Sequence, residues 1–288
     1  MNWQYHLVAN RPGTVRELLS NQLLIPKHLI YRLRTDKRVT VNHRYLPMNF
    51  QVAVGDQIQI SFEPDDFNSV QPPLSDCTDG VQVLFETNDV IVVNKHRGDK
   101  THPNQPGERG ATINHVAAYL APAHQQPYII HRLDQQTSGA IIFGKNPAVV
   151  PILTRLISEK RIKRSYLAWV SGTGMRSSGT IDLPIGIDPN DQRKRMVNGP
   201  HSLNAITHYQ VIRTSHHMTL LKIELSTGRT HQIRVHLAAI GHPLVGDPLY
   251  NPTPGNALQL HSYQLDLIQP FTMEHHLITA PLPTDFYM

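Results

Sequence analysis

The sequence predicts an α+β protein, in which a small α+β domain precedes a larger domain built on a mixed, mostly antiparallel β-sheet with peripheral helices. Three observations support this prediction. The first 63 residues contain two helical patterns followed by strands, residues 64–81 are rich in proline, aspartate and glycine, and the remainder alternates short apolar runs with few helical patterns. With 288 residues, the chain is long enough for two domains. We therefore expect domains at 1–63 and 82–288, joined by a linker at 64–81.

The elements expected in the first domain follow from local signals. Thr14 and Glu17 form a capping box at the start of a helix, because each can satisfy a backbone N–H near the other. The apolar residues of 26–33 recur at helical spacing, with a proline in the first turn. Residues 38–42 alternate as a strand, and residues 51–60 contain a Gly-Asp turn and a closing strand.

The second domain is expected to consist mainly of strands. A continuous apolar run at 90–95 predicts a central strand, and Pro151 places the start of a later helix near Val150. The expected strands are 90–95, 127–130, 140–144, 165–170, 208–212 and 220–225, and the expected helices are 112–120, 150–158 and a segment that follows Gly228.

The chain carries a formal net charge of +5, and its basic residues are unevenly distributed. Within residues 27–44, Asp36 is the only acidic residue. The basic residues of the same segment are Lys27, Arg32, Arg34, Lys37, Arg38 and Arg44. Such clustering is typical either of a solvated helix face or of a surface that binds a polyanion, and composition alone leaves both open.

Cysteine usage and hydropathy indicate the compartment. The single cysteine, Cys77, excludes an intramolecular disulfide and a cysteine-based metal cluster. The first residues lack the pattern of a signal peptide, and no apolar run approaches the roughly 18 residues that a membrane helix requires. We therefore expect a cytoplasmic protein with no membrane partner.

Four polar segments combine side chains that can carry out chemistry. They are 131–139 (HRLDQQTSG), 163–170 (KRSYLAWV), 226–237 (STGRTHQIRVHL) and 241–250 (GHPLVGDPLY). Taken singly, each has a structural explanation. Arg132 and Asp134 can close a turn, Tyr166 can belong to a strand core, and Arg234 can be a surface charge. The glycines of 241–246 can serve only to form turns.

Taken together, in this order and spacing, these segments resemble the RluA-type pseudouridine synthases. The first corresponds to the catalytic signature of that family, and the match extends over about residues 83–283. Residues 12–62 resemble the small S-four-like RNA-binding domain that many members carry, with Asn42-His43 in place of the usual Asn-Gly turn. The sequence departs from the family pattern at His96, at 202–205 and at Gln269.

The resemblance implies an isomerase that converts uridine in structured RNA to pseudouridine, with no cofactor and no metal. It implies that Asp134 is the nucleophile, that Arg234 is the cation beside it, and that Tyr166 contacts the uracil. Because a stacked base cannot reach such a site, the nucleotide must flip out, and Arg132 would fill the vacated space. Attack at ribose C1′ and attack at uracil C6 both remain open.

The implied partner is RNA, with ribosomal RNA as the preferred substrate and transfer RNA as the alternative. We expect the protein to be a monomer. The residues expected to contact RNA are Arg132, Lys27, Arg32, Arg34, Lys37, Arg38, Lys163, Arg164 and Arg229. One alternative is a catalytically inactive RNA-binding protein of the same fold, against which the intact catalytic residues argue. A metal-dependent nuclease is disfavoured, because His231 and His236 are five residues apart and do not share a helix face.

Overall fold

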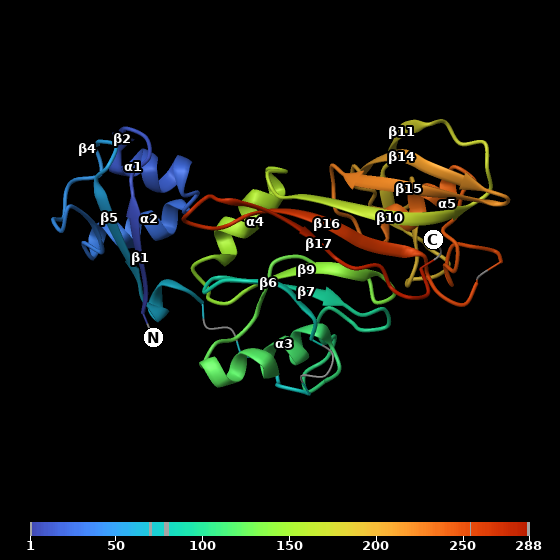
Figure 1. Cartoon of the computed structure of the whole chain (residues 1–288), viewed down its shortest axis with the longest axis horizontal. Coiled ribbons are helices and arrows are strands. Elements are labelled where there is room, and N and C mark those ends of the chain that lie inside the picture. The colour runs from blue at the N-terminus through green and yellow to red at the C-terminus, as the bar shows by residue number, and fades with distance from the viewer. Residues whose placement is uncertain (1, 69–70, 78–80, 254, 287–288) are drawn as a thin grey trace.

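The computed structural model describes residues 2–68, 71–77, 81–253 and 255–286, and confirms the α+β fold class. A small N-terminal unit lies at one end, and a long twisted sheet runs from the middle of the molecule to the other end (Figure 1). Parts of the predicted linker, 69–70 and 78–80, lie outside the described residues. The 3-10 turn η2 (Pro64–Asp66) begins the described part of this segment.

The N-terminal unit is an antiparallel sheet covered by helices. Its strands β1 (Trp3–Val8), β5 (Gln57–Phe62) and β3 (Val39–Val41) pair in the order β1-β5-β3, and β2 (Gly13–Thr14) pairs with β4 (Gln51–Val52). Its helices are α1 (Val15–Glu17), the π-helical turn η1 (Leu18–Gln22) and α2 (Lys27–Thr35). The predicted capping box is confirmed, because the Glu17 N–H donates to the Thr14 hydroxyl at 3.1 Å and the Thr14 N–H donates to the Glu17 carboxylate at 2.8 Å. Strand β1 was not predicted.

The Asn42-His43 turn keeps the geometry of a two-residue hairpin turn without its usual glycine. Both residues have positive φ, 49° for Asn42 and 65° for His43. The flanking residues Val41 and Arg44 exchange N–H to C=O hydrogen bonds of 2.8 and 3.0 Å. Histidine therefore occupies a left-handed position at which glycine is favoured, and the turn still closes.

The second unit is a mixed, mostly antiparallel sheet, as predicted. Its strand order is β11-β14-β15-β10-β16-β9-β7-β6, with β17 beside β16 and β8 beside β9. The strands are β6 (Val83–Glu86), β7 (Val90–Lys95), β8 (Tyr128–Ile129), β9 (Ser138–Gly144), β10 (Lys163–Ser171), β11 (Ser178–Asp182), β14 (Ile206–Ser215), β15 (Met218–Leu225), β16 (Leu260–Ile268) and β17 (His275–Thr279). The β9–β16 pair is parallel, whereas the other ladders of this sheet are antiparallel.

Within the described part of the chain, three α-helices and a small hairpin accompany the large sheet. They are α3 (Thr112–Leu120), followed by the 3-10 turn η3 (Ala121–Ala123), α4 (Val150–Ser158) and α5 (Gln232–Ala239), together with the hairpin β12 (Ile185–Ile187) and β13 (Arg195–Val197). Pro151 lies in the first turn of α4, as predicted. Helix α5 begins later than its position after Gly228 predicts, because His231 adopts a left-handed conformation with φ 57°.

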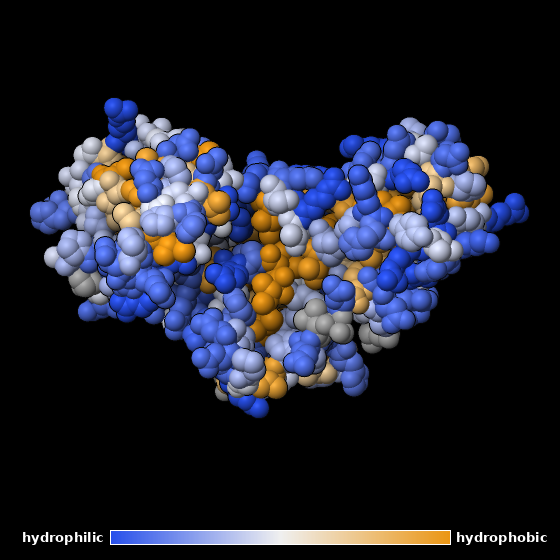
Figure 2. Space-filling model, turned by 180° about the vertical axis from the view of Figure 1, so that it is seen from behind, coloured by the Kyte–Doolittle hydropathy of each residue, from blue (hydrophilic) through white to orange (hydrophobic). Residues whose placement is uncertain are grey.

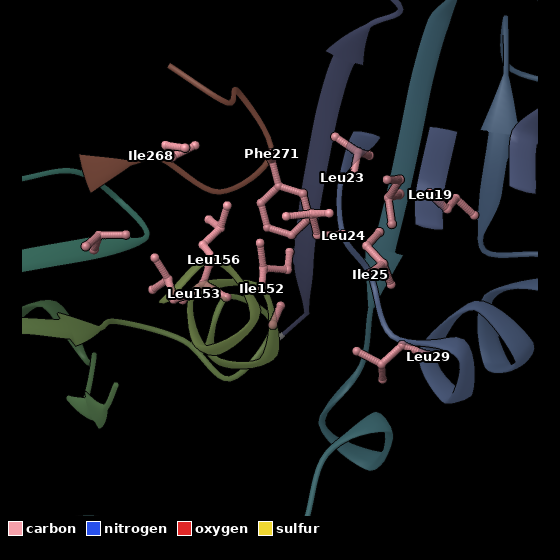
Figure 3. Close-up of a cluster of buried hydrophobic side chains, with 14 of the residues drawn as sticks. Leu19, Leu23, Leu24, Ile25, Leu29, Ile152, Leu153, Leu156, Ile268 and Phe271 are labelled. Atoms are coloured by element: carbon pink, nitrogen blue, oxygen red, sulfur yellow. The ribbon is translucent and has the colours of Figure 1, made fainter. Parts of the chain in front are cut away.

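The hydrophobic core of the N-terminal unit continues across the predicted domain boundary. Leu24 and Ile25 from the N-terminal unit point toward Ile152 and Leu156 of α4 and toward Phe271 (Figure 3). All five side chains are buried. The N-terminal unit is therefore packed against the second unit through apolar contacts, which are stabilised by the removal of this surface from water.

Polar contacts reinforce this packing. The Tyr5 ring stacks on Phe271 with a centroid separation of 3.6 Å, and its hydroxyl donates to the Asp89 carboxylate at 2.8 Å. Arg155 donates to the Ser20 carbonyl at 2.9 Å.

The space-filling view from behind shows two largely hydrophilic lobes on either side of a hollowed middle region with hydrophobic residues (Figure 2).

The parallel contact between β9 and β16 requires glycine at position 139. Gly139 pairs with Ser262 and has φ 111°, and a Cβ atom there would lie 2.2 Å from the Ser262 carbonyl oxygen. The adjacent Ser138 hydroxyl forms a 2.9 Å hydrogen bond with the His261 ring. The Ser-Gly pair at the end of the HRLDQQTSG segment therefore joins two central strands at van der Waals distance.

We expect Gly139→Ala to lower the free energy of unfolding by about 3 kcal/mol, because the added methyl group clashes with backbone that cannot move freely. Urea denaturation followed by circular dichroism measures the loss. Gly55→Ala is the matched control, since Gly55 also has a positive φ (95°) but open space around it. Its expected loss is about 1 kcal/mol, and equal losses in the two variants would contradict the close-approach argument.

Candidate active site

The loop that carries Asp134 is held by a nearby threonine. The Thr101 hydroxyl accepts the Leu133 N–H at 3.1 Å and donates to the Leu133 carbonyl at 2.9 Å. Beyond the acid, the Thr137 N–H donates to the Asp134 carbonyl at 3.0 Å and closes a turn. These bonds fix the backbone on both sides of the carboxylate, so that the side chain is presented from a rigid position.

A buried lysine joins the same loop to the end of β7. The Lys95 ammonium donates to the carbonyls of Asp99 at 2.6 Å and Gln135 at 3.1 Å, as well as to that of His96. Burial lowers the pKa of Lys95 to about 8, while the nearby Asp99 and Asp134 carboxylates oppose this shift. The sequence showed this lysine only as the end of a predicted strand, and its bonding role needed the fold.

Arg234 on α5 is the cation closest to Asp134. Its Nη1 lies 3.5 Å from Asp134 Oδ2. Arg234 is buried, with 3% of its surface exposed. The other face of the guanidinium forms a two-pronged ion pair, in which Nε and Nη2 each donate to the Asp247 carboxylate at 2.8 Å. Burial lowers the pKa of Arg234, but the hydrogen bonds and charge of Asp247 together with the charge of Asp134 outweigh it, so the pKa is raised overall.

Asp247 is a residue of the site that sequence reasoning did not assign. It is completely buried, and besides Arg234 its carboxylate accepts the N–H groups of Leu249 at 2.8 Å and Tyr250 at 3.2 Å. It lies in the segment 241–250, the last of the four polar segments identified from the sequence. The available signal was the Gly-Asp pair within that segment, but the sequence does not show that this acid faces Arg234.

Two further residues beside Arg234 were also not assigned. His231 Nε2 lies 3.9 Å from Asp134 Oδ2, and its Nδ1 is hydrogen-bonded to the Tyr250 hydroxyl at 2.8 Å. The Tyr250 ring also lies against Arg234, with 5.1 Å between the ring centroid and the guanidinium carbon. Both residues lie in segments that carry the family resemblance, but their spacing in the sequence did not identify them as part of the site.

Tyr166 lies on β10 and is buried, with 4% of its surface exposed. Burial raises the pKa of the Tyr166 hydroxyl, Arg164 lowers it, and Asp134 raises it further. The net direction is upward from the ordinary value near 10, so the phenol is neutral at pH 7. A neutral aromatic side chain on a rigid central strand is suited to contact a planar base.

Asp134, Tyr166, His231 and Arg234 line one cavity of about 380 Å³. Its polar lining includes Arg132, Asp134, Lys160, Arg164, Tyr166, Arg229, His231 and Arg234, and its apolar lining includes Leu133, Ile157, Leu225 and Leu260. Burial lowers the pKa of Lys160, and the neighbouring charges of Arg164 and Arg229 lower it further. The cavity thus combines several cationic side chains with apolar walls, and its volume is within the size range of small-molecule binding sites.

The structure separates the remaining predicted RNA-contacting residues into two locations. Lys163 is exposed at the start of β10. Lys27, Arg32, Arg34 and Lys37 are exposed on α2 and directly after it, in the N-terminal unit.

Arg38 differs from these four, because its guanidinium is engaged within the protein. It donates to both Asp66 carboxylate oxygens, at 2.5 and 2.7 Å, and to Asp36 at 2.6 Å. Only 11% of its side chain is exposed.

The departures from the family pattern lie at different distances from the cavity. The Asn204 carbonyl accepts a 3.0 Å hydrogen bond from Arg229, a cavity-lining residue. Gln269 bonds instead to the Glu274 carbonyl and to His276 near the β16–β17 turn. The change at 202–205 therefore lies beside the cavity.

Two geometric searches concern other classes of site. Among the residues that the structure describes, no three His, Cys, Asp or Glu side chains are grouped closely enough to hold a metal ion. No helix in the described ranges has the length and apolar character needed to cross a bilayer.

Comparisons with known proteins define the class. Residues 89–239 match the family described as RNA pseudouridylate synthase, and residues 9–58 match the RluD ribosomal pseudouridine synthase N-terminal domain. The chain therefore belongs to the RNA pseudouridylate synthase family, which confirms the predicted RluA-type resemblance and the predicted isomerase class.

Individual relatives agree over most of their length. The uncharacterised RNA pseudouridine synthase YhcT of Bacillus subtilis is 35% identical over 274 residues, which cover 93% of this chain and 89% of that protein. Ribosomal large subunit pseudouridine synthase D of Escherichia coli is 34% identical, with 87% and 81% covered. The structure of human RNA pseudouridylate synthase domain containing 1 superposes with a TM-score of 0.62 at 25% identity, with 72% and 86% covered.

We expect acid to destabilise the protein through His131, which lies beside the cavity. The Ile142 N–H donates to His131 Nε2 at 3.2 Å, and burial, with the charge of Arg164, lowers the pKa of His131 to about 3. In the unfolded chain the pKa is about 6.5. Between these values the unfolded state binds the extra proton, so the free energy of unfolding falls as pH falls, by about 2 kcal/mol at pH 5.

Urea denaturation at pH 7 and pH 5 measures this loss. In His131→Asn the loss between the two pH values should be smaller by about the same amount, because asparagine does not titrate. An identical pH dependence in the two proteins would show that His131 is not the responsible group.

Proposed function

We propose that this protein isomerises specific uridines in large-subunit ribosomal RNA to pseudouridine, with Asp134 as the nucleophile. The observation that carries the proposal is the placement of Asp134 at 3.5 Å from the buried Arg234, inside a cavity lined by further cations. Relatives named ribosomal large subunit pseudouridine synthase D support the choice of RNA. We further propose that the protein acts as a monomer in the cytoplasm.

The reaction needs a nucleophile but no redox step. The bond between uracil N1 and ribose C1′ breaks, the base turns, and C5 bonds to C1′. C5 then loses its proton and N1 gains one, so the product has the same composition as uridine. An ionised carboxylate adds to the nucleotide, at C1′ or at C6, and leaves again once the new bond has formed. The guanidinium of Arg234 stabilises the negative charge of Asp134 both before attack and after departure.

Access to this cavity requires a nucleotide that has left its stack. In our proposal the extruded uracil lies against the face of Tyr166, and the apolar cavity residues exclude water from the reacting atoms. Arg132 is exposed and lines the same cavity. We assign it to the space that the flipped nucleotide vacates and to the adjoining phosphates.

Basic side chains outside the reacting centre supply the affinity for RNA. Arg164 and Arg229 line the cavity, and Lys163 lies beside Arg164 in the sequence. The exposed cations of α2 form a second group in the N-terminal unit, which we propose to be an S-four-like RNA-binding domain. Arg38 contributes less to this surface, because its guanidinium is already paired with Asp66.

We expect Asp134→Asn to reduce pseudouridine formation at least about 1,000-fold, because an amide cannot act as the nucleophile. RNA affinity should change less than about threefold, since the variant keeps the shape of the cavity and its cationic side chains. Site-resolved pseudouridine profiling of ribosomal RNA from cells lacking the gene, complemented with each variant, measures the activity. Asp65→Asn, an exposed substitution, is the control. Turnover by purified Asp134→Asn would refute the assigned role, and modification confined to transfer RNA would refute the assigned substrate.

Lys27→Ala and Arg34→Ala should each weaken binding to a large-subunit ribosomal RNA fragment. Each should also reduce the slope of log affinity against log salt by about 1, because one phosphate contact is lost. The single-turnover rate at saturating enzyme should not change, because neither residue lies in the cavity lining given above. Filter binding between 50 and 300 mM salt measures the slope. Arg38→Ala is the contrasting variant, which should instead lose folding stability because Asp66 is left unpaired. An unchanged salt dependence of RNA affinity in Lys27→Ala and Arg34→Ala would contradict the proposed surface.

A further inference from the structure

Two nitrogen atoms approach the same oxygen of the Asp134 carboxylate. Arg234 Nη1 lies 3.5 Å from Oδ2, and His231 Nε2 lies 3.9 Å from Oδ2. We propose that His231 is a positioning residue which, together with Arg234, anchors Oδ2 and leaves Oδ1 as the attacking atom. This inference rests on the proposed function, because it assigns the geometry of the same nucleophile.

The hydrogen bonds around Tyr250 determine which nitrogen of His231 carries the proton. The Arg195 N–H donates to the Tyr250 hydroxyl oxygen at 2.9 Å. The hydroxyl proton is therefore free to be donated to His231 Nδ1, which lies 2.8 Å away. With Nδ1 acting as an acceptor, the neutral ring carries its proton on Nε2, the nitrogen that faces Asp134. A donor thus points at the carboxylate, as the anchoring role requires.

The position of the His231 ring is fixed by its own segment. Gln232 Oε1 accepts the Thr227 hydroxyl at 2.8 Å and the Arg229 N–H at 2.9 Å, which ties down the residues before α5. His231 then takes a left-handed φ of 57°, and its ring meets Tyr250 edge to face at 5.7 Å. Catalytic hydrogen bonds are commonly long in the absence of substrate, so a separation of 3.9 Å is consistent with tightening when RNA binds.

Tyr250 orients both anchors of the carboxylate. Its hydroxyl binds His231, and its ring lies 5.1 Å from the Arg234 guanidinium carbon. Because its hydroxyl also accepts the Arg195 N–H from β13, the hairpin β12–β13 is connected to the nucleophile through two hydrogen bonds and the 3.9 Å contact between His231 and Asp134. The adjoining Arg193 and Lys194 are cations that can meet RNA phosphates.

Two substitutions distinguish hydrogen-bond donation by the His231 side chain from a purely structural role of its left-handed backbone. Glutamine places an amide N–H₂ near the position of Nε2, whereas asparagine is shorter and does not reach it. Asparagine, however, tolerates the left-handed backbone better than glutamine does. A donor role and a purely structural role therefore predict opposite orders of activity for the same two variants.

The test measures single-turnover pseudouridine formation on large-subunit ribosomal RNA purified from cells lacking the gene. We expect His231→Gln to retain activity within about fivefold of the wild type, and His231→Asn and His231→Ala to lose about 30-fold or more, with RNA affinity unchanged. A more active Asn variant than Gln variant would overturn the inference. If the wild-type protein forms no pseudouridine on any RNA, the proposed function fails instead.

A second measurement determines directly which nitrogen of His231 carries the proton in the wild-type protein. Nitrogen-15 NMR of histidine-labelled protein at pH 7.5 should show His231 with its proton on Nε2, and its signals are identified by their loss in His231→Gln. In Tyr250→Phe, which keeps the ring beside Arg234, the tautomers should become mixed, and the single-turnover rate should fall by about three- to tenfold. A proton on Nδ1 in the wild type would overturn the inference even where RNA activity is absent.

Discussion

The site depends on a buried guanidinium that must be paired on every side. An unpaired cation inside a protein costs several kcal/mol, and Arg234 is almost completely buried. Asp247 satisfies Nε and Nη2, which leaves Nη1 directed at Asp134. The orientation of the cation is therefore set by Asp247 and not by the nucleophile. In our proposal Asp134 can for this reason bond to the nucleotide and return, while the cation stays in place.

The fold connects this centre to the N-terminal unit through α4. Ile152 and Leu156 on this helix pack against the core of the N-terminal unit, whereas Ile157 and the following Lys160 line the cavity. The proposed RNA-binding surface on α2 thus belongs to a unit that is packed against a wall of the active site, rather than tethered at a distance. Removing that unit would expose Ile152 and Phe271, so single substitutions on α2 test its role more cleanly than truncation.

Local signals in the sequence were sufficient for many elements. The capping box of Thr14 and Glu17, the first-turn Pro151 and the apolar strand at 90–95 each depend on interactions within a few residues, and each was confirmed. Three of the four motif segments also identified side chains that share one cavity, and the fourth supplies Asp247, which pairs with Arg234. Features that depend on distant partners were not predictable. The pairing of Asp247 with Arg234, the enclosure of Arg38 by Asp66 and the pairing of β1 with β5 all arise only when the chain is folded.

The most direct test of the account is to find which residue becomes attached to RNA during the reaction. Acid-quenched mixtures of the enzyme and large-subunit ribosomal RNA can be digested with nuclease and trypsin and analysed by mass spectrometry. The account predicts a nucleotide mass on the tryptic peptide 133–145, with fragment ions that place it on Asp134. A nucleotide mass on any other peptide of an active enzyme would contradict it.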